Sequence, residues 1–448
     1  MKVRKVLSIL LASVLTLGLM GCSDAPEQEA SSDAAETVET VETEAEAESA
    51  PAEDASSGDK LTVAIWDSNQ QPGIQELLDD WSKESGIKAE TQVINWNEYW
   101  TLLEAGASGG TLPDVFWMHS NQSQRYMENG LLLDLTDKIA ASDKIDLSNY
   151  YEDITKLYES DGKIYALPKD IDTIALWYNK TMFDEAGVEY PNAEWTWDDF
   201  YEAAKKLTKD DGSQWGYGIN TGNNQDSYYN MIYDYGGYII NDDKTKSGYD
   251  DPNTIKAMQL VEKMVREGLC PELEVISENG ADVLFQSGKV AMVTQGSWMV
   301  AGFRDNEYTN KNCDVAVLPM GPDGKRVSIY NGLGWAAAAN GKNTDAAWSL
   351  IEYLGTEAAQ LKQAQLGVTM SAYKGTSDAW VNSVDCFDLQ GHLDMLDAEL
   401  VIRPYSRNTN VWEDMATETF KGAWTGDITM EEACKQIAES MNASLAEE

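Results

Sequence analysis

The sequence is poor in the residues that most metal and catalytic sites need. Its 448 residues include only two histidines, His119 and His392, and neither has the spacing of a zinc-ligand set. Cysteine occurs five times, without any C-x-x-C pair, at Cys22, Cys270, Cys313, Cys386 and Cys434. We therefore expect no metal and no cofactor. The last four cysteines allow three disulfide pairings if all are oxidised, and free buried thiols fit the sequence equally well.

Basic residues are also scarce. Lys and Arg together number 33, against 76 Asp and Glu, which gives a formal net charge of -43. A charge of this sign repels nucleic acid and anionic membrane surfaces at long range. We therefore expect no nucleic-acid partner.

Phosphate-binding and nucleophile motifs are absent or out of context. No P-loop occurs, and no G-x-G-x-x-G follows a predicted strand. Residues 106–110 match G-x-S-x-G around Ser108, with His392 as a conceivable triad partner. A nucleophile elbow needs a strand and then a helix, whereas here a helix precedes the serine and a loop follows it, so we predict a helix C-cap. With 76 acidic residues, the pattern alone does not exclude a carboxylate pair for glycoside hydrolysis.

The only long apolar run belongs to a predicted signal peptide at residues 1–21. Lys2, Arg4 and Lys5 precede an apolar run at residues 6–19, which is short for a membrane span. The residues up to Cys22 resemble a bacterial lipobox, which implies cleavage before Cys22 and lipidation of its side chain. The alternative is an ordinary signal peptide with an incidental cysteine.

Residues 22–59 are predicted to be a disordered acidic tether. Residues 23–59 contain 13 acidic side chains and no Lys or Arg, and such a segment buries too little apolar surface to offset its chain entropy. The leader contributes +3 and this segment -13 of the total of -43, which leaves -33 for residues 60–448. The folded body is therefore itself strongly acidic.

The remaining chain is long enough for two α/β lobes. Strands are predicted at residues 61–66, 89–94 and 114–118, with helices between them, and this alternation favours a largely parallel sheet. Ligands bind beyond the carboxyl ends of such strands, so residues 66–71 and 117–121 should share one rim. No fixed-period repeat occurs. Further elements are predicted as strands at 173–179, 290–294, 313–318 and 335–339, and as helices at 197–207, 255–266, 345–354, 413–424 and 430–445.

The aromatic residues are mostly those with a polar atom. Phe occurs 7 times, against 15 Trp and 21 Tyr, and several Trp lie beside Asp, Asn or Ser near predicted strand ends. A sugar presents apolar C–H faces and a ring of hydroxyl groups, so flat aromatic rings and polar side chains together suit it. Any one of these tryptophans is as easily explained by core packing. Their joint placement at loop starts indicates a carbohydrate site.

Six stretches in order resemble the family 1 extracellular solute-binding proteins of ABC sugar importers, a group that includes maltose-binding protein. The resemblance covers nearly all of residues 60–448. The stretches are LTVAIWD at 61–67, LPDVFWM at 112–118 with GLLLDL at 130–135, DTIALWYNK at 172–180, WTWDDF at 195–200, GKVAM at 288–292 with GSW at 296–298, and VLP at 317–319.

The resemblance implies a periplasmic-binding-protein-like α/β fold, with two lobes joined by a hinge and the ligand cleft between them. Lobe 1 would comprise residues 60–168 and 334–380, and lobe 2 residues 169–333 and 381–448. Crossings between the lobes would fall near 166–172, near 331–335 and around 375–390. The ligand-binding residues implied are Trp66, Asp67, Asn69, Trp117, Ser120, Asn121, Asp172, Trp298, Asn331, Trp335, Arg403 and Trp412.

The resemblance also implies a non-catalytic receptor. It would bind a carbohydrate by closure of its lobes and deliver it to the permease subunits of an ABC transporter. We expect a monomer at the extracellular side of the cell membrane, held there by the lipid on Cys22. Alternatives are a binding protein for a non-sugar solute, such as a peptide or polyamine, and a surface glycoside hydrolase.

Overall fold

The computed structural model describes residues 60–448. The predicted signal peptide, the predicted lipidation at Cys22 and the acidic tether lie outside the described residues. Within residues 60–448, no helix is both long and apolar enough to cross a membrane. The four cysteines of this part are all free thiols, so none of the three possible disulfide pairings forms there.

Five strands form a first sheet in the order β2-β1-β3-β12-β6. β1 lies parallel to β2 and β3, whereas β12 is antiparallel to both of its neighbours. Helices cover both faces of this sheet, so β3 is buried along its whole length. The strands of the first sheet are β1 (Lys60–Ile65), β2 (Lys88–Val93), β3 (Val115–Met118), β6 (Ala166–Pro168) and β12 (Gly334–Ala337).

Four strands form a second sheet in the order β10-β7-β9-β8. β7 is antiparallel to β9 and β10, and only β8 and β9 are parallel. The parallel pairing predicted from the strands at 61–66, 89–94 and 114–118 is confirmed for β1, β2 and β3. It does not extend to β12 or to most of the second sheet. β7 receives the chain from β6 of the first sheet, and β12 receives it from β11 (Val327–Tyr330), which belongs to neither of these two sheets. Neither strand follows a helical crossover from its own neighbour, and only such a crossover leads to a parallel pair. The strands are β7 (Ile174–Asn179), β8 (Trp215–Gly218), β9 (Val290–Gly296) and β10 (Cys313–Ala316).

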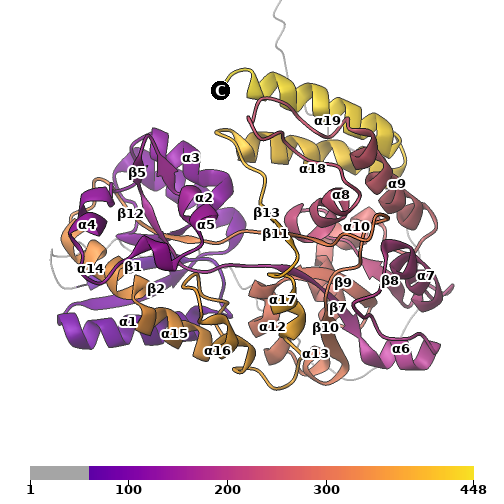
Figure 1. Cartoon of the computed structure of the whole chain (residues 1–448), viewed down its shortest axis with the longest axis horizontal. Coiled ribbons are helices and arrows are strands. Elements are labelled where there is room, and N and C mark those ends of the chain that lie inside the picture. The colour runs from indigo at the N-terminus through magenta and orange to yellow at the C-terminus, as the bar shows by residue number, and fades with distance from the viewer. Residues whose placement is uncertain (1–59) are drawn as a thin grey trace, which may run out of the picture. The chain divides into compact units, whose positions relative to one another are not determined.

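The chain passes between the two sheets through paired extended segments. Residues 169–173 join β6 to β7, and residues 331–333 join β11 (Val327–Tyr330) to β12. Asp172 and Asn331 form an isolated bridge between these two connections. A third segment, β13 (Glu399–Ile402), pairs in parallel with β11. Figure 1 shows these segments running through the middle of the described structure, between the two sheets.

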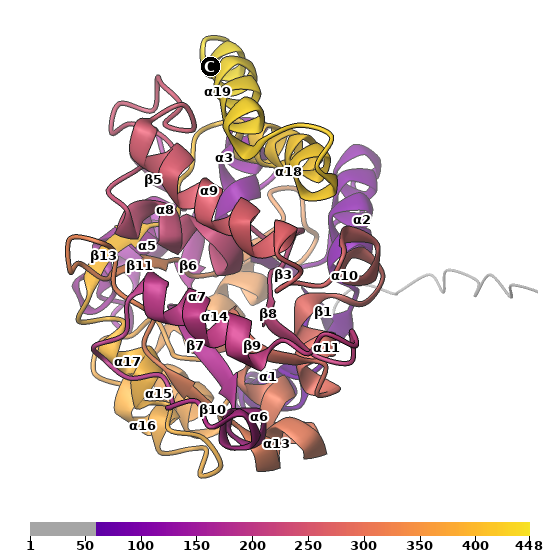
Figure 2. The ribbon, with the colours of Figure 1, turned by 90° about the vertical axis from the view of Figure 1, so that its right-hand side faces the viewer.

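Nineteen α-helices surround the sheets in the described part. Helices α9, α18 and α19 lie side by side against the second sheet's core, where Figures 1 and 2 both place the C-terminal end. The helices are α1 (Gln71–Ser85), α2 (Trp96–Gly109), α3 (Ser120–Glu128), α4 (Thr136–Ala141), α5 (Glu152–Lys156), α6 (Lys180–Ala186), α7 (Trp197–Leu207), α8 (Asn230–Asp234), α9 (Pro252–Arg266), α10 (Leu273–Asn279), α11 (Ala281–Gln286), α12 (Val300–Asp305), α13 (Glu307–Asn312), α14 (Thr344–Gly355), α15 (Glu357–Gln365), α16 (Ser377–Val381), α17 (Gln390–Asp394), α18 (Thr409–Thr425) and α19 (Met430–Leu445).

Short elements complete the described part. The π-helix η2 directly precedes α8 and supplies part of the site described below. These elements are β4 (Glu159–Ser160), β5 (Lys163–Ile164), η1 (Leu147–Asn149), η2 (Gln225–Tyr229) and η3 (Ser297–Met299).

Local sequence signals explain where several helices begin and end. α7 starts with a capping box in which Thr196 and Asp199 satisfy each other's backbone N–H groups, so the helix runs as predicted. α2 ends at Gly109 and is capped by Gly110, whose φ of 69° is the left-handed conformation that favours glycine. This confirms that the G-x-S-x-G match is a helix C-cap.

Candidate ligand-binding site

Loops from both sheets enclose a cavity of about 690 Å³. The first sheet contributes the segment after β1, residues 66–70, and the residues that follow β3. The second sheet contributes residues 297–299 after β9 and residues 220 and 222–225 after β8, and α18 adds further side chains. The connections near 170–172 and 333 line it as well, so groups on both sides and at the crossings face the same space.

Tryptophan rings from both sheets line this cavity. Trp66 and Trp96 stand edge to face with ring centroids 5.0 Å apart, and Trp66 is held from behind by Tyr99 at 5.0 Å. Trp96 remains 39% exposed. Trp298 comes from the second sheet, and a Cβ on Gly296 would lie 2.1 Å from its ring. Glycine at 296 therefore allows the ring to occupy this position.

A chain of polar contacts ties the first loop to the crossings. Asp67 accepts hydrogen bonds from the backbone of Asn69 at 2.8 Å and from Gln70 at 2.9 Å. Gln70 in turn accepts from Lys169 at 2.9 Å, and the Lys169 ammonium lies 2.6 Å from Asp170. Lys169 is fully buried, so this ion pair is protected from solvent screening.

Asp172 is a buried carboxylate on the first crossing. Its Oδ1 accepts from Gln225 Nε2 at 2.7 Å and from the Asn331 backbone N–H at 3.0 Å. Burial, followed by the charge of neighbouring Asp170, raises the pKa of Asp172 to about 7. The residue is 8% exposed and lines the cavity, where a carboxyl oxygen can accept a hydroxyl group.

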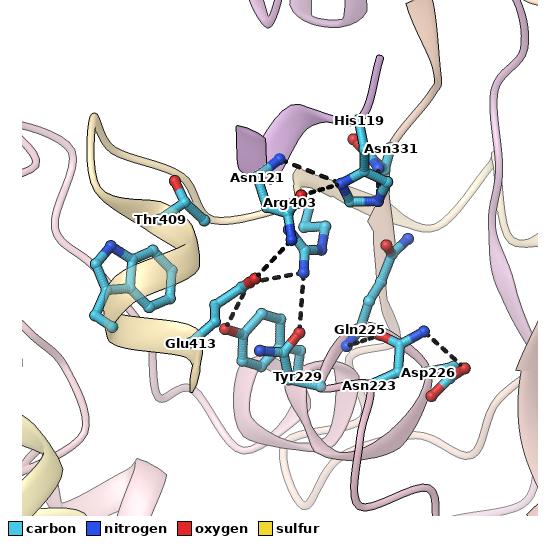
Figure 3. Close-up of polar contacts among 12 residues, drawn as sticks. His119, Asn121, Asn223, Gln225, Asp226, Tyr229, Asn331, Arg403, Thr409 and Glu413 are labelled. Carbon is cyan, nitrogen blue, oxygen red and sulfur yellow. Dashed lines mark hydrogen bonds and ion pairs between the residues drawn. The ribbon is translucent and has the colours of Figure 1, made fainter. Parts of the chain in front are cut away.

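Arg403 and Glu413 form a buried ion pair at the α18 side of the cavity (Figure 3). Arg403 Nη2 lies 2.7 Å from Glu413 Oε1, and the same nitrogen donates to Asn224 at 3.1 Å. Glu413 also receives longer contacts of 3.4 Å from Asn121 and from Tyr229. The pair therefore joins α18, the 220–225 loop and α3.

His119 lies between the first sheet and a crossing (Figure 3). Its Nδ1 is 2.8 Å from Asn121 Oδ1, and its Nε2 is 3.3 Å from Asn331 Nδ2. Burial, followed by the nearby charge of Arg403, lowers the pKa of His119 to about 3. The ring is therefore neutral at physiological pH, and its two nitrogens connect Asn121 to Asn331.

Seven of the twelve predicted ligand-binding residues line the cavity. They come from the loops after β1 and β9, from the first crossing, and from the segments next to α3 and β13. They are Trp66, Asp67, Asn69, Asn121, Asp172, Trp298 and Arg403.

The structure does not place the other five in the cavity lining, so their role as ligand contacts stays a prediction. Trp117 and Trp335 lie within strands and pack against each other, with ring centroids 6.1 Å apart. Trp412 is buried and donates from Nε1 to Ser406 at 2.9 Å. The side chains of Ser120 and Asn331 are buried and are not among the lining residues.

Other lining residues were not predicted from sequence. Trp96 was assigned no role, although it follows the strand predicted at 89–94 closely, as Trp66 follows β1. Residues 220–225 contain three asparagines after β8. A polar loop at the end of a strand is the feature from which these lining residues could have been predicted. Asp282 and Asp414 carry no such signal, because they reach the cavity from helices whose orientation depends on the tertiary fold.

The geometry gives no support to Ser108 as the nucleophile of a Ser-His catalytic pair. Ser108 lies in the last turn of α2, whereas the buried His392 contacts Thr173, whose hydroxyl is 3.3 Å from its Nδ1. Within residues 60–448, no group of three or more His, Cys, Asp or Glu side chains is placed to hold a metal ion.

Known proteins match both the sequence and the fold. A galactooligosaccharide-binding protein of Bacillus subtilis is 29% identical over 324 residues, covering 69% of this chain and 72% of that protein. The maltodextrin-binding protein MdxE of the same organism is 23% identical over 367 residues, covering 79% and 77%.

The solved structures of similar proteins support the fold. An ABC substrate-binding protein of Listeria monocytogenes in complex with cycloalternan has a TM-score of 0.80 at 25% identity, covering 87% of this chain and 99% of that one. The GacH receptor of Streptomyces glaucescens has a TM-score of 0.77 at 21% identity, with the same coverage. These likenesses confirm the predicted periplasmic-binding-protein-like α/β fold.

The family described as bacterial extracellular solute-binding protein matches residues 67–361, which is more than half of the chain. The matched proteins are named as binding proteins and receptors, not as enzymes. The chain therefore belongs to the bacterial extracellular solute-binding protein family.

Proposed function

We propose that this protein is the substrate-binding component of an ABC transporter and that it binds an oligosaccharide. One observation carries the proposal: tryptophans from both sheets line a single cavity together with carboxylates and amides. The volume of about 690 Å³ falls within the range of ~300–1,000 Å³ typical of small-molecule sites. The galactooligosaccharide- and maltodextrin-binding relatives support an oligosaccharide as the ligand.

The lining chemistry suits the two faces of a sugar. Trp66, Trp96 and Trp298 offer flat surfaces for the apolar C–H groups, and a ring stacked in this way excludes water from them. Asn69 and Asp172 offer amide and carboxyl groups that fix the directions of hydroxyl groups. A ligand held by both kinds of group would be recognised by shape and by hydroxyl pattern.

Lobe closure would couple ligand binding to transport. In this proposal, the first sheet and residues 334–380 belong to lobe 1, while the second sheet and residues 381–448 belong to lobe 2. The connections at 169–173 and 331–333 would serve as hinges. A ligand that contacts both lobes favours the closed state by its difference in affinity for the two states. The permease subunits would then recognise the closed form.

Lipidation of Cys22 would hold the receptor at the extracellular side of the membrane. The lipobox-like residues before Cys22 support this part of the proposal, and the acidic segment up to residue 59 would act as a spacer. Mass spectrometry of the protein expressed in a lipoprotein-processing host should show loss of residues 1–21 and a lipid-modified Cys22. Cys22→Ala should release the protein into the medium.

Sugar binding is tested by intrinsic fluorescence together with isothermal titration calorimetry. Maltotriose, cellotriose and galactotriose are titrated into the protein, with spermidine and a tripeptide as non-sugar arms. We expect saturable heat and a change in tryptophan fluorescence with at least one trisaccharide. A response to spermidine or the peptide alone would replace the sugar proposal. The trisaccharide should also be recovered intact after prolonged incubation, because a hydrolase would cleave it.

A polyamine is the second candidate. The surplus of carboxylates around the cavity favours it, because a cation can sit between acidic and aromatic side chains. The amide-rich 220–225 loop favours a sugar instead, since amides pair with hydroxyl groups and carry no charge.

A further inference from the structure

The cavity's single cationic side chain is already engaged by the protein. Within residues 60–448, Arg403 is the only Lys or Arg that lines the cavity. Its Nη2 contacts Glu413 Oε1 at 2.7 Å and Asn224 Oδ1 at 3.1 Å. Both partners of the ion pair are buried, with side chains 5% and 8% exposed, so salt screens the pair little. The pair thus offers a ligand no net positive charge.

The hydrogen-bonding geometry of the guanidinium leads to the same conclusion. A carboxylate binds a guanidinium bidentately along one of two edges, Nε with Nη2 or Nη1 with Nη2. Because Glu413 and Asn224 both use Nη2, neither edge of Arg403 is free for a ligand carboxylate. Nε, with one N–H, and Nη1, with two, are buried and have no hydrogen-bond partner within the described part of the chain.

The other acidic side chains in the lining also disfavour a ligand carboxylate. Asp67, Asp172, Asp282 and Asp414 line the cavity and form no ion pair within residues 60–448. A ligand carboxylate about 5 Å from one ionised acid would lose a factor of roughly 100 in affinity at an effective dielectric constant of about 20. No cation in the lining is free to offset that repulsion.

We propose that Glu413 determines the ligand class of this cavity: by holding Arg403, it restricts the site to sugars without carboxylate groups and makes it reject uronates. The inference rests on the proposed sugar-binding function. It adds a selection against sugars with carboxylate groups. Sugar binding alone does not require this selection, since a sugar receptor with a free arginine would accept sugar acids.

The first test compares sugars that differ in charge alone. Maltotriose, cellotriose and galactotriose are titrated calorimetrically beside their C6-oxidised uronate forms and the corresponding uncharged C6-amides. The wild type should bind the uronate at least ~100-fold more weakly than the amide of the same trisaccharide. Uronate affinity within tenfold of the amide would overturn the inference and leave the sugar-binding function standing. If no sugar binds at all, the function itself fails and this inference falls with it.

The second test separates Glu413 from the general acidity of the cavity. Glu413→Gln keeps an oxygen that can accept from Arg403 but removes the negative charge, so the guanidinium regains its net charge. We expect this variant to lower the ratio of amide affinity to uronate affinity by at least ~tenfold. Asp414→Asn is the matched control, because it removes one charge from the next residue of α18, which also lines the cavity but does not contact Arg403. Asp414→Asn removes one repelling charge but leaves Arg403 held by Glu413, so it should lower the ratio at least ~threefold less than Glu413→Gln does.

Equal effects of the two variants would overturn the role of Glu413. Thermal unfolding of both variants checks that each is folded before its ratio of amide affinity to uronate affinity is compared with that of the wild type. If Glu413→Gln does not fold, Glu413→Asp replaces it. The shorter side chain keeps the charge but loosens the contact with Arg403, and it should relax the rejection of uronates. A ratio unchanged in Glu413→Asp would also count against the inference.

Discussion

Replacing Asp172 with asparagine should stabilise the protein at alkaline pH and weaken ligand binding. The pKa of this carboxyl is raised from 3.8 to about 7, mainly by burial. Between about pH 4 and pH 7 the folded protein therefore binds this proton more tightly than the unfolded chain does. The free energy of unfolding contributed by Asp172 is highest below pH 4 and falls as the pH rises, because the ionised form must be buried.

The size of this change in the free energy of unfolding follows from the shift in the pKa of Asp172. About three pKa units at ~1.36 kcal/mol each give up to about 4 kcal/mol of stability lost above pH 7. Asparagine keeps an oxygen that can accept from Gln225 and from the Asn331 backbone, so those hydrogen bonds survive. We expect Asp172→Asn to be more stable than the wild type at pH 8, by about 2 kcal/mol if half of the cost is recovered. At pH 5 the two should be nearly equal.

Binding should change in the opposite direction. The second carboxyl oxygen of Asp172 has no hydrogen-bond partner in the described part of the chain, and asparagine places an NH2 donor there. Losing an acceptor for a ligand hydroxyl should weaken binding about tenfold, or ~1.4 kcal/mol.

Denaturant unfolding at pH 5 and pH 8, with calorimetry at pH 8, measures both changes. Asp210→Asn, on an exposed turn, is the control and should change neither quantity. If the variant is less stable than the wild type at pH 8, the claim that burial of the ionised Asp172 carboxylate lowers the free energy of unfolding is refuted. Unchanged ligand affinity would refute its role as a hydroxyl acceptor.

The remaining predictions concern the rings and the buried lysine. Trp298→Ala should weaken trisaccharide binding by about 2 kcal/mol in calorimetry, whereas Trp412→Phe should leave affinity unchanged, since that ring lies outside the cavity. Gly296→Ala should also weaken binding, because its Cβ would meet the Trp298 ring at 2.1 Å; unchanged affinity would show that the ring's position is not needed. Lys169→Met should lower the free energy of unfolding by about 3–5 kcal/mol, because it leaves the carboxylate of Asp170 buried without its cation. A loss below 1 kcal/mol would show that the ion pair contributes little.

The helices were predictable because their signals are local. α7 and α19 begin at capping boxes, with Thr196 and Thr429 as caps, and both follow regular apolar spacing. The direction of the strands was predictable only in part. The parallel sheet inferred from alternating elements holds for β1, β2 and β3, but β7 and β12 take their direction from where the chain crosses between the lobes. That is a long-range property, which no window of the sequence contains.

The candidate site was predictable where a side chain follows a strand and unpredictable where it lies within one. Trp66 comes directly after β1, and Trp298 comes two residues after β9, and both line the cavity. Trp117 and Trp335 lie inside β3 and β12 and are buried completely. The same residue type was assigned the same role in all four places, although the strands predicted at 114–118 and 335–339 already contained Trp117 and Trp335.

The reason lies in how the sheets are covered. A strand with helices on both faces has no solvent side, so each tryptophan inside it must pack in the core, whichever face it points to. A cavity can open only beyond the last paired residue, where backbone and side chains leave the layer between the helices. A shift of one or two residues in the predicted end of a strand therefore moves a tryptophan from the ligand site to the core. The boundaries of β3 and β12, more than the residue types, decided which of these tryptophans line the cavity.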